Sequence, residues 1–348
     1  MRRAGMSLTS EERILKTLRR EEVDRIPTFE WFVDPKVIDA IYPGSTYQEF
    51  VYKADQDAIC VDLDYKSEEL EPQVYRDEWG IVKKDTGESH TYPIDGPIKT
   101  MADLAKYEPP DPHKPERYLT LESELQAHQG IKAVILHLND VFSIPSRLMG
   151  FEHFLMTTID NPKLIEGIIE LCVEVNLKMA DEAVKRGVKI IYTGDDFAHK
   201  LAPMISPADF KKIFFPPLCR VMGGYKDRGL YIIKHTDGEI MPLIDMIVDS
   251  GIDCLDPIDP TAGMNIAEIK KKYGPRIALK GNVDCAHTLT FGSVEQTIAE
   301  SKRCIQLAGP GGGYIFSSGN SIHSGVKPEN YIAMMETHKK YCNYPIQL

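Results

Sequence analysis

The feature of this chain that most constrains its fold is a regular alternation of short apolar runs and helix-like segments. Eight runs rich in β-branched and aromatic residues are predicted to be buried strands: residues 26–30, 58–63, 132–137, 188–193, 231–234, 252–256, 276–280 and 313–317. Most of them are followed by a segment with helical periodicity. This alternation specifies a parallel sheet, and eight such units close most simply as a barrel. We therefore predict an α/β fold, a (β/α)8 TIM barrel.

The length and the weaker stretches suggest how the domain is organised. A chain of 348 residues fits one barrel, so we predict a single domain over residues 1–348. Residues 1–24 form an N-terminal helical segment, whose helix has a capping signal at Thr9 or Ser10. In residues 66–130 the periodicity weakens, and Pro and Gly indicate hairpins and loops. This stretch is too polar to hold a core of its own, so we predict a lid-like excursion.

An open, doubly wound sheet is the alternative to a barrel. That fold would carry a GxGxxG phosphate-binding turn after an early strand, and the sequence has none. The glycines at 311–313 precede a predicted strand and do not open a helix, so they indicate a turn rather than a phosphate cradle. The barrel is favoured.

Composition excludes several classes of function. The net charge of −11 and the pI of about 5.5 argue against a nucleic-acid partner. No apolar run approaches the roughly 20 residues of a membrane span. Met1-Arg2-Arg3 is followed by a polar helix and not by the apolar core of an export signal. The seven cysteines form no CxxC pair, which indicates reduced thiols. We expect a cytoplasmic protein.

The stretch LYIIKHTDG at 230–238 is the strongest candidate for chemistry. Residues i and i+2 of an extended segment point to the same face, so His235 and Asp237 project together from the end of a strand. Both residue types bind metals or move protons. The alternative is structural, because Asp is also a common N-cap and a helix is predicted to follow.

The barrel prediction collects further polar residues into one site, because active sites of this fold lie at the carboxyl ends of the strands. Three histidines and a cysteine with many carboxylates predict a rim that can hold a divalent metal and handle a proton, although some members must be helix caps. The candidates are Glu30, Asp62, Asp64, His137, Asn139, Asp195, Asp196, His235, Asp237, Asp256, Asn282, Asp284, Cys285, Ser318, Asn320 and His323.

The sequence contains a set of short motifs: SEERILKTLRREEVDRIP at 10–27, DD at 195–196, MISP at 204–207, FFP at 214–216, HTDG at 235–238, GMN at 263–265, KGNVD at 280–284, GGGYIFSSGNSIH at 311–323 and PENYIAM at 328–334. In combination they resemble the uroporphyrinogen decarboxylase superfamily, especially its corrinoid-dependent methyltransferase and O-demethylase branch. The likeness is weakest at about 66–130. It implies a (β/α)8 barrel with its site at the carboxyl-terminal rim.

The decarboxylase branch fits this resemblance less well. Its members hold a substrate with eight carboxylates through an arginine-rich segment after the first strand, where this chain has FEWFVD at 29–34. An acidic segment there would repel the substrate. Asp64 could match the aspartate that gathers the pyrrole nitrogens. The family's histidine near the last strand is Asn320 here.

The methyltransferase branch fits better, with departures. The similar thiol methyltransferases hold zinc through a His-x-Cys motif and a later Cys, whereas this chain has His235-Thr236-Asp237 and Asn320. Without two thiolates the site suits an oxygen substrate. A harder site, made by His235, Asp237, and Cys285 or Glu30, could act as a Lewis acid on an ether or phenol oxygen.

The resemblance implies these roles. Catalytic residues are His235, Asp237, Asp196 and Asp64; substrate contacts come from Glu30, Trp31, His137, Asn139, Asn282 and Asn320; and zinc is held by His235, Asp237, Cys285 and His323. Trp31, Phe32, Trp79 and the excursion could line the donor pocket, or simply pack.

The implied activity moves a methyl group from a small donor, such as a methoxyphenol, to cob(I)alamin. A separate corrinoid protein would carry the cobalamin, because the barrel uses the whole chain. Three alternatives stay open: decarboxylation of a tetrapyrrole, methyl transfer between a methylcobamide and a thiol or tetrahydrofolate, and corrinoid or tetrapyrrole binding without catalysis. A homodimer is also left open.

Overall fold

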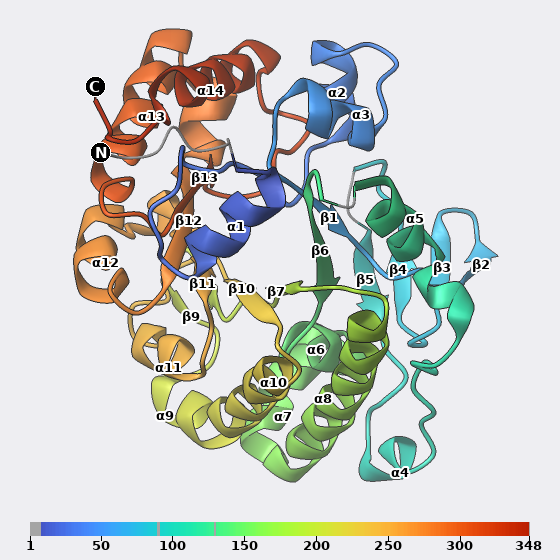
Figure 1. Cartoon of the computed structure of the whole chain (residues 1–348). Helices are drawn as coiled ribbons and strands as arrows, with labels where there is room; N and C mark the ends of the chain where they lie inside the picture. The colour runs from blue at the N-terminus through green and yellow to red at the C-terminus, as the bar shows by residue number, and fades with distance from the viewer. Residues whose placement is uncertain (1–7, 89–90, 129, 348) are drawn as a thin grey trace. The chain divides into compact units, whose positions relative to one another are not determined.

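The computed structural model describes residues 8–88, 91–128 and 130–347 (Figure 1). The stretch Met1-Arg2-Arg3, on which part of the export argument was based, lies outside these residues. The chain divides into two compact units, which are described separately. Unit 1 comprises residues 1–60, 125–135 and 253–348, and unit 2 comprises residues 61–124 and 136–252.

The predicted alternation of parallel strands and helices is confirmed. Seven strands form the parallel sheet: β1 (Ala58–Val61), β6 (Ala133–Leu138), β7 (Ile190–Gly194), β10 (Tyr231–His235), β11 (Cys254–Asp256), β12 (Ala278–Val283) and β13 (Tyr314–Ser318). These strands are almost wholly buried, as expected of a sheet covered on both faces. The fold is an α/β barrel type with seven regular strands.

The predicted first strand, residues 26–30, was wrong as a regular strand. This part of unit 1 makes isolated bridges instead, two of them parallel, from Thr28 to Phe316 and from Val33 to Ile322, and one antiparallel, from Arg25 to Asn343. Pro27 accepts a hydrogen bond from the backbone N–H of Phe316 at 2.9 Å. Because proline has no N–H to return, the ladder cannot continue through it.

Unit 1 contains the strands β11, β12 and β13, which pair in parallel. Its helices are α1 (Ser10–Leu18), α2 (Pro35–Ile41), α3 (Tyr47–Lys53), α12 (Ile266–Tyr273), α13 (Val294–Ala308) and α14 (Pro328–Tyr341), with short turns η3 (Pro260–Ala262) and η4 (Cys285–Leu289). The predicted cap of α1 is confirmed, since Thr9 and Glu12 form a capping box. Helices α13 and α14 lie side by side (Figure 1).

Unit 2 contains the parallel pair β7 and β10, whose register sets His235 opposite Gly194. Its helices are α6 (Ser143–Met149), α7 (Phe151–Asp160), α8 (Pro162–Lys185), α9 (Pro207–Asp209), α10 (Phe215–Asp227) and α11 (Ile244–Asp249), and β8 (Ala198–His199) pairs with β9 (Ala202–Pro203). A π-helical turn, η2 (Phe210–Phe214), precedes α10. The proline pair at 216–217 therefore lies in the first turn of a helix, where proline is tolerated.

The excursion at 66–130 holds the predicted hairpins. Its strands β2 (Ser67–Glu71), β3 (Val74–Asp77), β4 (Val82–Lys84) and β5 (Tyr92–Asp95) form an antiparallel sheet in that order, followed by α4 (Met101–Leu104), η1 (Pro115–Tyr118) and α5 (Leu119–His128). Most residues of this sheet are exposed. Trp79 lies between β3 and β4 and is buried, and its carbonyl accepts a hydrogen bond from Tyr107.

Two predictions based on composition can be compared with the fold. None of the seven cysteines, which all lie within the described residues, forms a disulfide, as the absence of CxxC pairs predicted. Within the described residues, no helix has the length and apolarity needed to cross a bilayer.

Candidate active site

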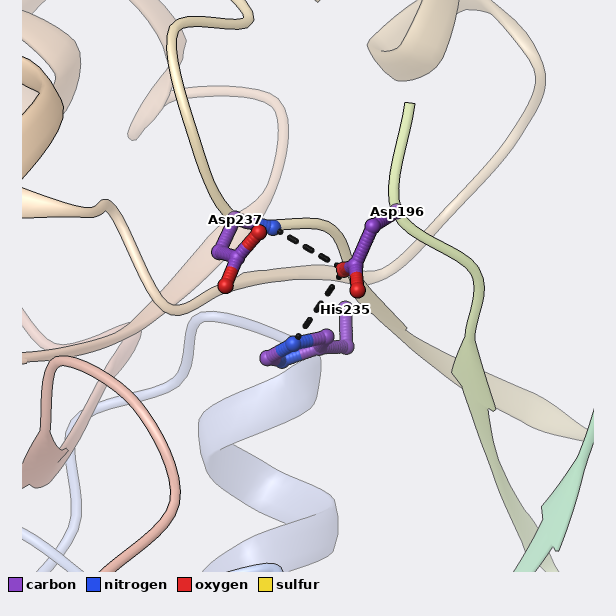
Figure 2. Close-up of side chains that lie close together, drawn as sticks. All are labelled: Asp196, His235 and Asp237. Carbon is purple, nitrogen blue, oxygen red and sulfur yellow. Dashed lines mark hydrogen bonds and ion pairs between the residues drawn. The ribbon is translucent and has the colours of Figure 1, made fainter. Parts of the chain in front are cut away.

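Three side chains of unit 2 meet where β7 and β10 end. Because the two strands are parallel neighbours, their carboxyl ends emerge together. Asp196 follows β7, His235 is the last residue of β10, and Asp237 follows that strand. Potential ligand atoms of the three residues all lie within 4.8 Å of one another. Figure 2 shows the carboxylate of Asp196 facing both the ring of His235 and the backbone of Asp237.

The contacts within this group are specific. Asp196 Oδ1 lies 3.5 Å from His235 Nε2 and accepts a hydrogen bond from the backbone N–H of Asp237 at 3.3 Å. The His235 side chain is 7% exposed, and that of Asp196 is 45% exposed. The site therefore combines a buried imidazole with a carboxylate that solvent or a ligand can reach. The predicted i, i+2 projection of His235 and Asp237 places both in one group.

A buried ionic network lies directly behind these residues in the chain. The Lys234 ammonium donates to the carbonyl oxygens of Asp195 at 2.6 Å and His235 at 2.8 Å, and it lies 2.8 Å from Asp140 Oδ2. Asp195 Oδ2 accepts hydrogen bonds from the backbone N–H groups of Asp140 and Phe142. Lys234 thus ties the end of β7 to the end of β10, and with them the residues that carry Asp196 and His235.

Asp140 and Asp195 are two buried carboxyl groups beside the single ammonium of Lys234, and their pKa values are shifted in opposite directions. Burial and the charge of Asp195 raise the pKa of Asp140 well above its usual value. Burial opposes ionisation of Asp195 too, but the hydrogen bond from Asp140 and the charge of Lys234 lower its pKa to about 2. Asp140 is therefore the protonated partner, and Asp195 carries the negative charge that balances Lys234.

His137 lies beside the same strands. Its Nδ1 is 2.6 Å from Asp62 Oδ1, and its ring is 6.0 Å from that of Tyr192, which is 5.8 Å from the ring of His235. A Cβ on Gly194 would lie 2.8 Å from His137 Nε2, so the glycine leaves room for this imidazole. The predicted substrate contact His137 thus belongs to a row of rings that reaches the candidate site.

Two other predicted residues of unit 2 have structural contacts. Asp64 accepts hydrogen bonds from the backbone N–H and the hydroxyl of Thr120, at 2.9 and 2.7 Å. The carbonyl of Asn139 accepts a hydrogen bond from Tyr225. The contacts of Asp64 are those of a carboxylate that fixes a helix start, and a catalytic role for it stays a prediction.

Glu30 is a predicted residue of unit 1 whose carboxyl group has a strongly raised pKa. It is 1% exposed, and its carboxyl oxygens meet the backbone N–H and the hydroxyl of Ser318 at 2.9 and 2.7 Å. Burial raises the pKa of Glu30 to about 7, against the opposing charge of Lys280. The Ser318 hydroxyl also donates to the carbonyl of Asn320. A proton on Glu30 lets both contacts of this hydroxyl be hydrogen bonds.

Cys285, Asn282 and His323 are held by neighbours within unit 1. Burial and the charge of Glu30 raise the pKa of the Cys285 thiol to about 12, and the thiol donates to the carbonyl of Ser321 at 3.1 Å. The Asn282 amide donates to the carbonyl of Ile258 and accepts from the Cys304 thiol.

The exposed ring of His323 accepts from the Gly325 N–H at Nδ1, which places its proton on Nε2, 3.3 Å from the Thr290 hydroxyl. Trp31 is half-buried. A metal or substrate role for these residues stays a prediction.

The fold is of the α/β barrel class. The profile of the family described as uroporphyrinogen decarboxylase (URO-D) matches residues 83–341, well over half of the chain. The chain belongs to the uroporphyrinogen decarboxylase family.

Curated relatives with two different activities resemble the chain. A uroporphyrinogen decarboxylase of Thioalkalivibrio sulfidiphilus is 25% identical over 185 residues, which are 52% of this chain and 50% of the relative. A methylcobamide:CoM methyltransferase of Methanosarcina barkeri is 24% identical over 199 residues, 57% of this chain and 56% of the relative. The chain thus spans about half the length of these two relatives.

A solved structure confirms the fold. A methyltransferase from Methanosarcina mazei superimposes with a TM-score of 0.76 at 19% identity, covering 96% of this chain and 99% of that one. At this identity the likeness establishes the barrel architecture, and the activity must be argued from the site.

Proposed function

We propose that the protein is a corrinoid-dependent methyltransferase. It would move a methyl group from a small aryl methyl ether, such as a methoxyphenol, to the cob(I)alamin of a separate corrinoid protein. The observation that carries this proposal is the group of Asp196, His235 and Asp237 at the ends of two parallel strands. The methylcobamide methyltransferase among the relatives supports the corrinoid partner.

The three residues fit a divalent metal, and zinc is the ion that we propose. One imidazole and two carboxylates match the nitrogen and oxygen ligands of catalytic zinc sites, which use three protein ligands and leave a position open. Two ligand atoms about 2.1 Å from one ion lie at most about 4.2 Å apart. The observed group lies within 4.8 Å, so small side-chain movements suffice to bring it together. Asp196 completes the set in place of the predicted Cys285 or His323.

The donor set also indicates the kind of substrate. Asp237 stands where the similar thiol methyltransferases carry a cysteine, so the site is harder than a thiolate site and favours an oxygen ligand. A bound ion would supply a Lewis acid for the ether oxygen as the phenolate leaves.

The protein's own contribution is to hold this site in place. His235 is buried, and Lys234 binds the backbone carbonyls of residues at the ends of both strands. The phenolate that leaves requires its negative charge to be stabilised, and an ion held by these residues would supply that stabilisation.

Decarboxylation of a porphyrinogen is the second candidate, and the curated decarboxylase relatives favour it. That substrate carries eight carboxylates and requires several cationic groups. The segment that should supply them, residues 29–34, contains two acids and no arginine or lysine. The methyltransferase therefore fits the charges of this chain better.

An anaerobic spectroscopic assay tests the proposal. The zinc-supplied protein is mixed with cob(I)alamin and a panel of methoxyphenols, methylamines and methanol, and the formation of methylcobalamin is followed. We expect turnover with the aryl ethers, lost in His235→Ala. The matched control is His199→Ala, since His199 is an exposed histidine of the same unit.

The assay also has a result that contradicts the proposal. No methylcobalamin from any donor, even with corrinoid proteins of the same source added, would exclude the methyltransferase. Release of carbon dioxide from a porphyrinogen by the same preparation would then support the second candidate.

A further inference from the structure

A cavity of about 260 Å³ in unit 2 has Asp196 in its wall. Its other walls come from the edge strand β5, helix α6, the start of α7 and Met204. A cavity of this size lies at the small end of ligand sites, which suits one aromatic ring and not a tetrapyrrole. The cavity thus adjoins the candidate metal site through a shared residue.

Arg147 is the charged group that most distinguishes this cavity. It lies on α6, lines the cavity and is exposed. Across the described part of the chain, its guanidinium has no hydrogen-bond or ion-pair partner. A guanidinium offers a planar fork that matches a carboxylate. The alternative explanation is that Arg147 is a solvated cation in the last turn of a helix, where cations are favoured.

The one other carboxylate in the cavity wall, Asp95, does not satisfy Arg147. Asp95 Oδ1 lies 2.7 Å from Lys99 Nζ and accepts the Gly96 N–H at 2.9 Å. The hydrogen bond from Lys99 lowers the pKa of Asp95. The negative charge of Asp95 is therefore already balanced by Lys99, and Arg147 remains available to an anion from outside the chain.

The wall that carries Asp95 is fixed against the helix that carries Arg147. A Cβ on Gly96 would lie 2.2 Å from the carbonyl oxygen of Arg147, so only glycine permits this approach. The Ile98 N–H donates to the carbonyl of Leu148 at 2.9 Å, and Lys99 donates to that of Met149. The cavity is therefore a built feature of the fold and needs little rearrangement to receive a ligand.

The remaining walls are aromatic. Tyr92 and Phe151 are 65% and 48% exposed, and both line the cavity. Phe142 forms a buried wall and packs edge-on against Phe154. Large aromatic side chains exposed beside a cavity provide stacking surfaces for another ring. An aromatic ligand with a negative substituent thus matches both the surface and the charge.

We propose that this cavity binds the methyl donor as an aromatic carboxylate, with the carboxylate paired to Arg147 and the ether oxygen toward Asp196. The carboxylate of Asp196 would repel the carboxylate of the ligand, so the ligand's carboxylate points toward Arg147 and away from Asp196. The inference rests on the proposed function for calling the ligand a methyl donor, but the binding of an aromatic carboxylate can be tested without any reaction.

The test is a calorimetric titration of the full chain with benzoate, benzamide and acetate. Benzamide has the shape of benzoate without its charge, and acetate has the charge without the ring. We expect benzoate to bind at least about 10-fold more tightly than benzamide, because a hydrogen-bonded charge pair discriminates by about 10- to 100-fold. Benzoate should also bind more tightly than acetate, because acetate has no ring to stack on the aromatic walls. Arg147→Gln should remove the preference for benzoate over benzamide, and Arg147→Lys should restore part of it.

The matched control is Arg76→Gln, an arginine of the same unit on β3, away from the residues that line the cavity. It should keep the preference for benzoate. Equal affinities of wild-type protein for benzoate and benzamide would overturn the inference, as would an unchanged preference in Arg147→Gln.

These outcomes separate the inference from the proposed function. Selective binding of benzoate that depends on Arg147, without methyl transfer from any donor, would uphold the site and refute the methyltransferase. Transfer from a methoxybenzoate that needs His235 but is insensitive to Arg147→Gln would do the reverse.

Discussion

Replacing Lys234 by methionine should destabilise the protein more than any exposed substitution. Lys234 is fully buried, and its ammonium contacts three oxygen atoms at 2.6 to 2.8 Å. Methionine fills similar space but leaves the charge of Asp195 without its counter-ion. Removing one partner of a buried charge pair costs about 3–5 kcal/mol, and we expect a loss of that size in the free energy of unfolding.

The protonation of the network gives this prediction a matched comparison. Asp140 is the protonated carboxyl, so asparagine can replace it and still donate to Asp195. We expect Asp140→Asn to cost under about 1 kcal/mol, close to one neutral hydrogen bond. The exposed Lys212, replaced by methionine, should change stability by less than about 0.5 kcal/mol.

Urea denaturation followed by circular dichroism measures all three variants. If Lys234→Met costs less than about 1 kcal/mol, or if Asp140→Asn costs as much as Lys234→Met, the assignment of charges in this network is wrong. We also expect weaker zinc binding by Lys234→Met, because Lys234 ties together the strand ends that carry His235 and Asp196.

Three further predictions concern single residues. Glu30 has a pKa raised from 4.5 to about 7, so its contribution to stability is present below pH 4.5 and falls by about 3 kcal/mol as pH rises through 7. Denaturation at two pH values should therefore show that Glu30→Gln is more stable than the wild type at pH 8 and loses that advantage at pH 5. His338 is buried and donates from Nε2 to the Ile26 carbonyl, and burial lowers its pKa to about 4. Its contribution to stability is therefore present above pH 6.5 and falls by about 3 kcal/mol as pH drops through 4, a loss that thermal melts of His338→Gln should not show. Gly238 has φ +81° and no room for a Cβ, which would lie 2.8 Å from the His199 carbonyl, whereas Gly229 has φ +75° and open space. Gly238→Ala should therefore lower the free energy of unfolding by about 1–3 kcal/mol more than Gly229→Ala does. Equal losses would contradict the packing argument.

The sequence was sufficient to predict the barrel and the strand ends. Seven of the eight strands predicted from hydrophobic runs form, and each of the seven is buried on both faces. The exception contains Pro27, which breaks hydrogen-bond pairing in a way that hydrophobicity does not show. The i, i+2 rule placed His235 beside Asp237, since the end of β10 is extended.

Other parts of the candidate site had no signal in the sequence. Lys234 looked like a strand residue, and only the fold shows that it contacts Asp140, far away along the chain. Arg147 has no motif around it, and its importance comes from the absence of a partner among the described residues, in a cavity built from three separate segments. Long-range pairing of this kind depends on packing, which single-sequence periodicity does not contain.

Methyl transfer by metal-stripped and reconstituted protein tests the central claim most directly. Protein treated with a chelator is mixed with cob(I)alamin and a methoxyphenol, with and without one equivalent of zinc, and methylcobalamin is measured. We expect stripped protein to be inactive and zinc to restore transfer in the wild type but not in His235→Ala. Transfer that survives full removal of the metal, or that zinc restores equally in His235→Ala, would contradict the claim.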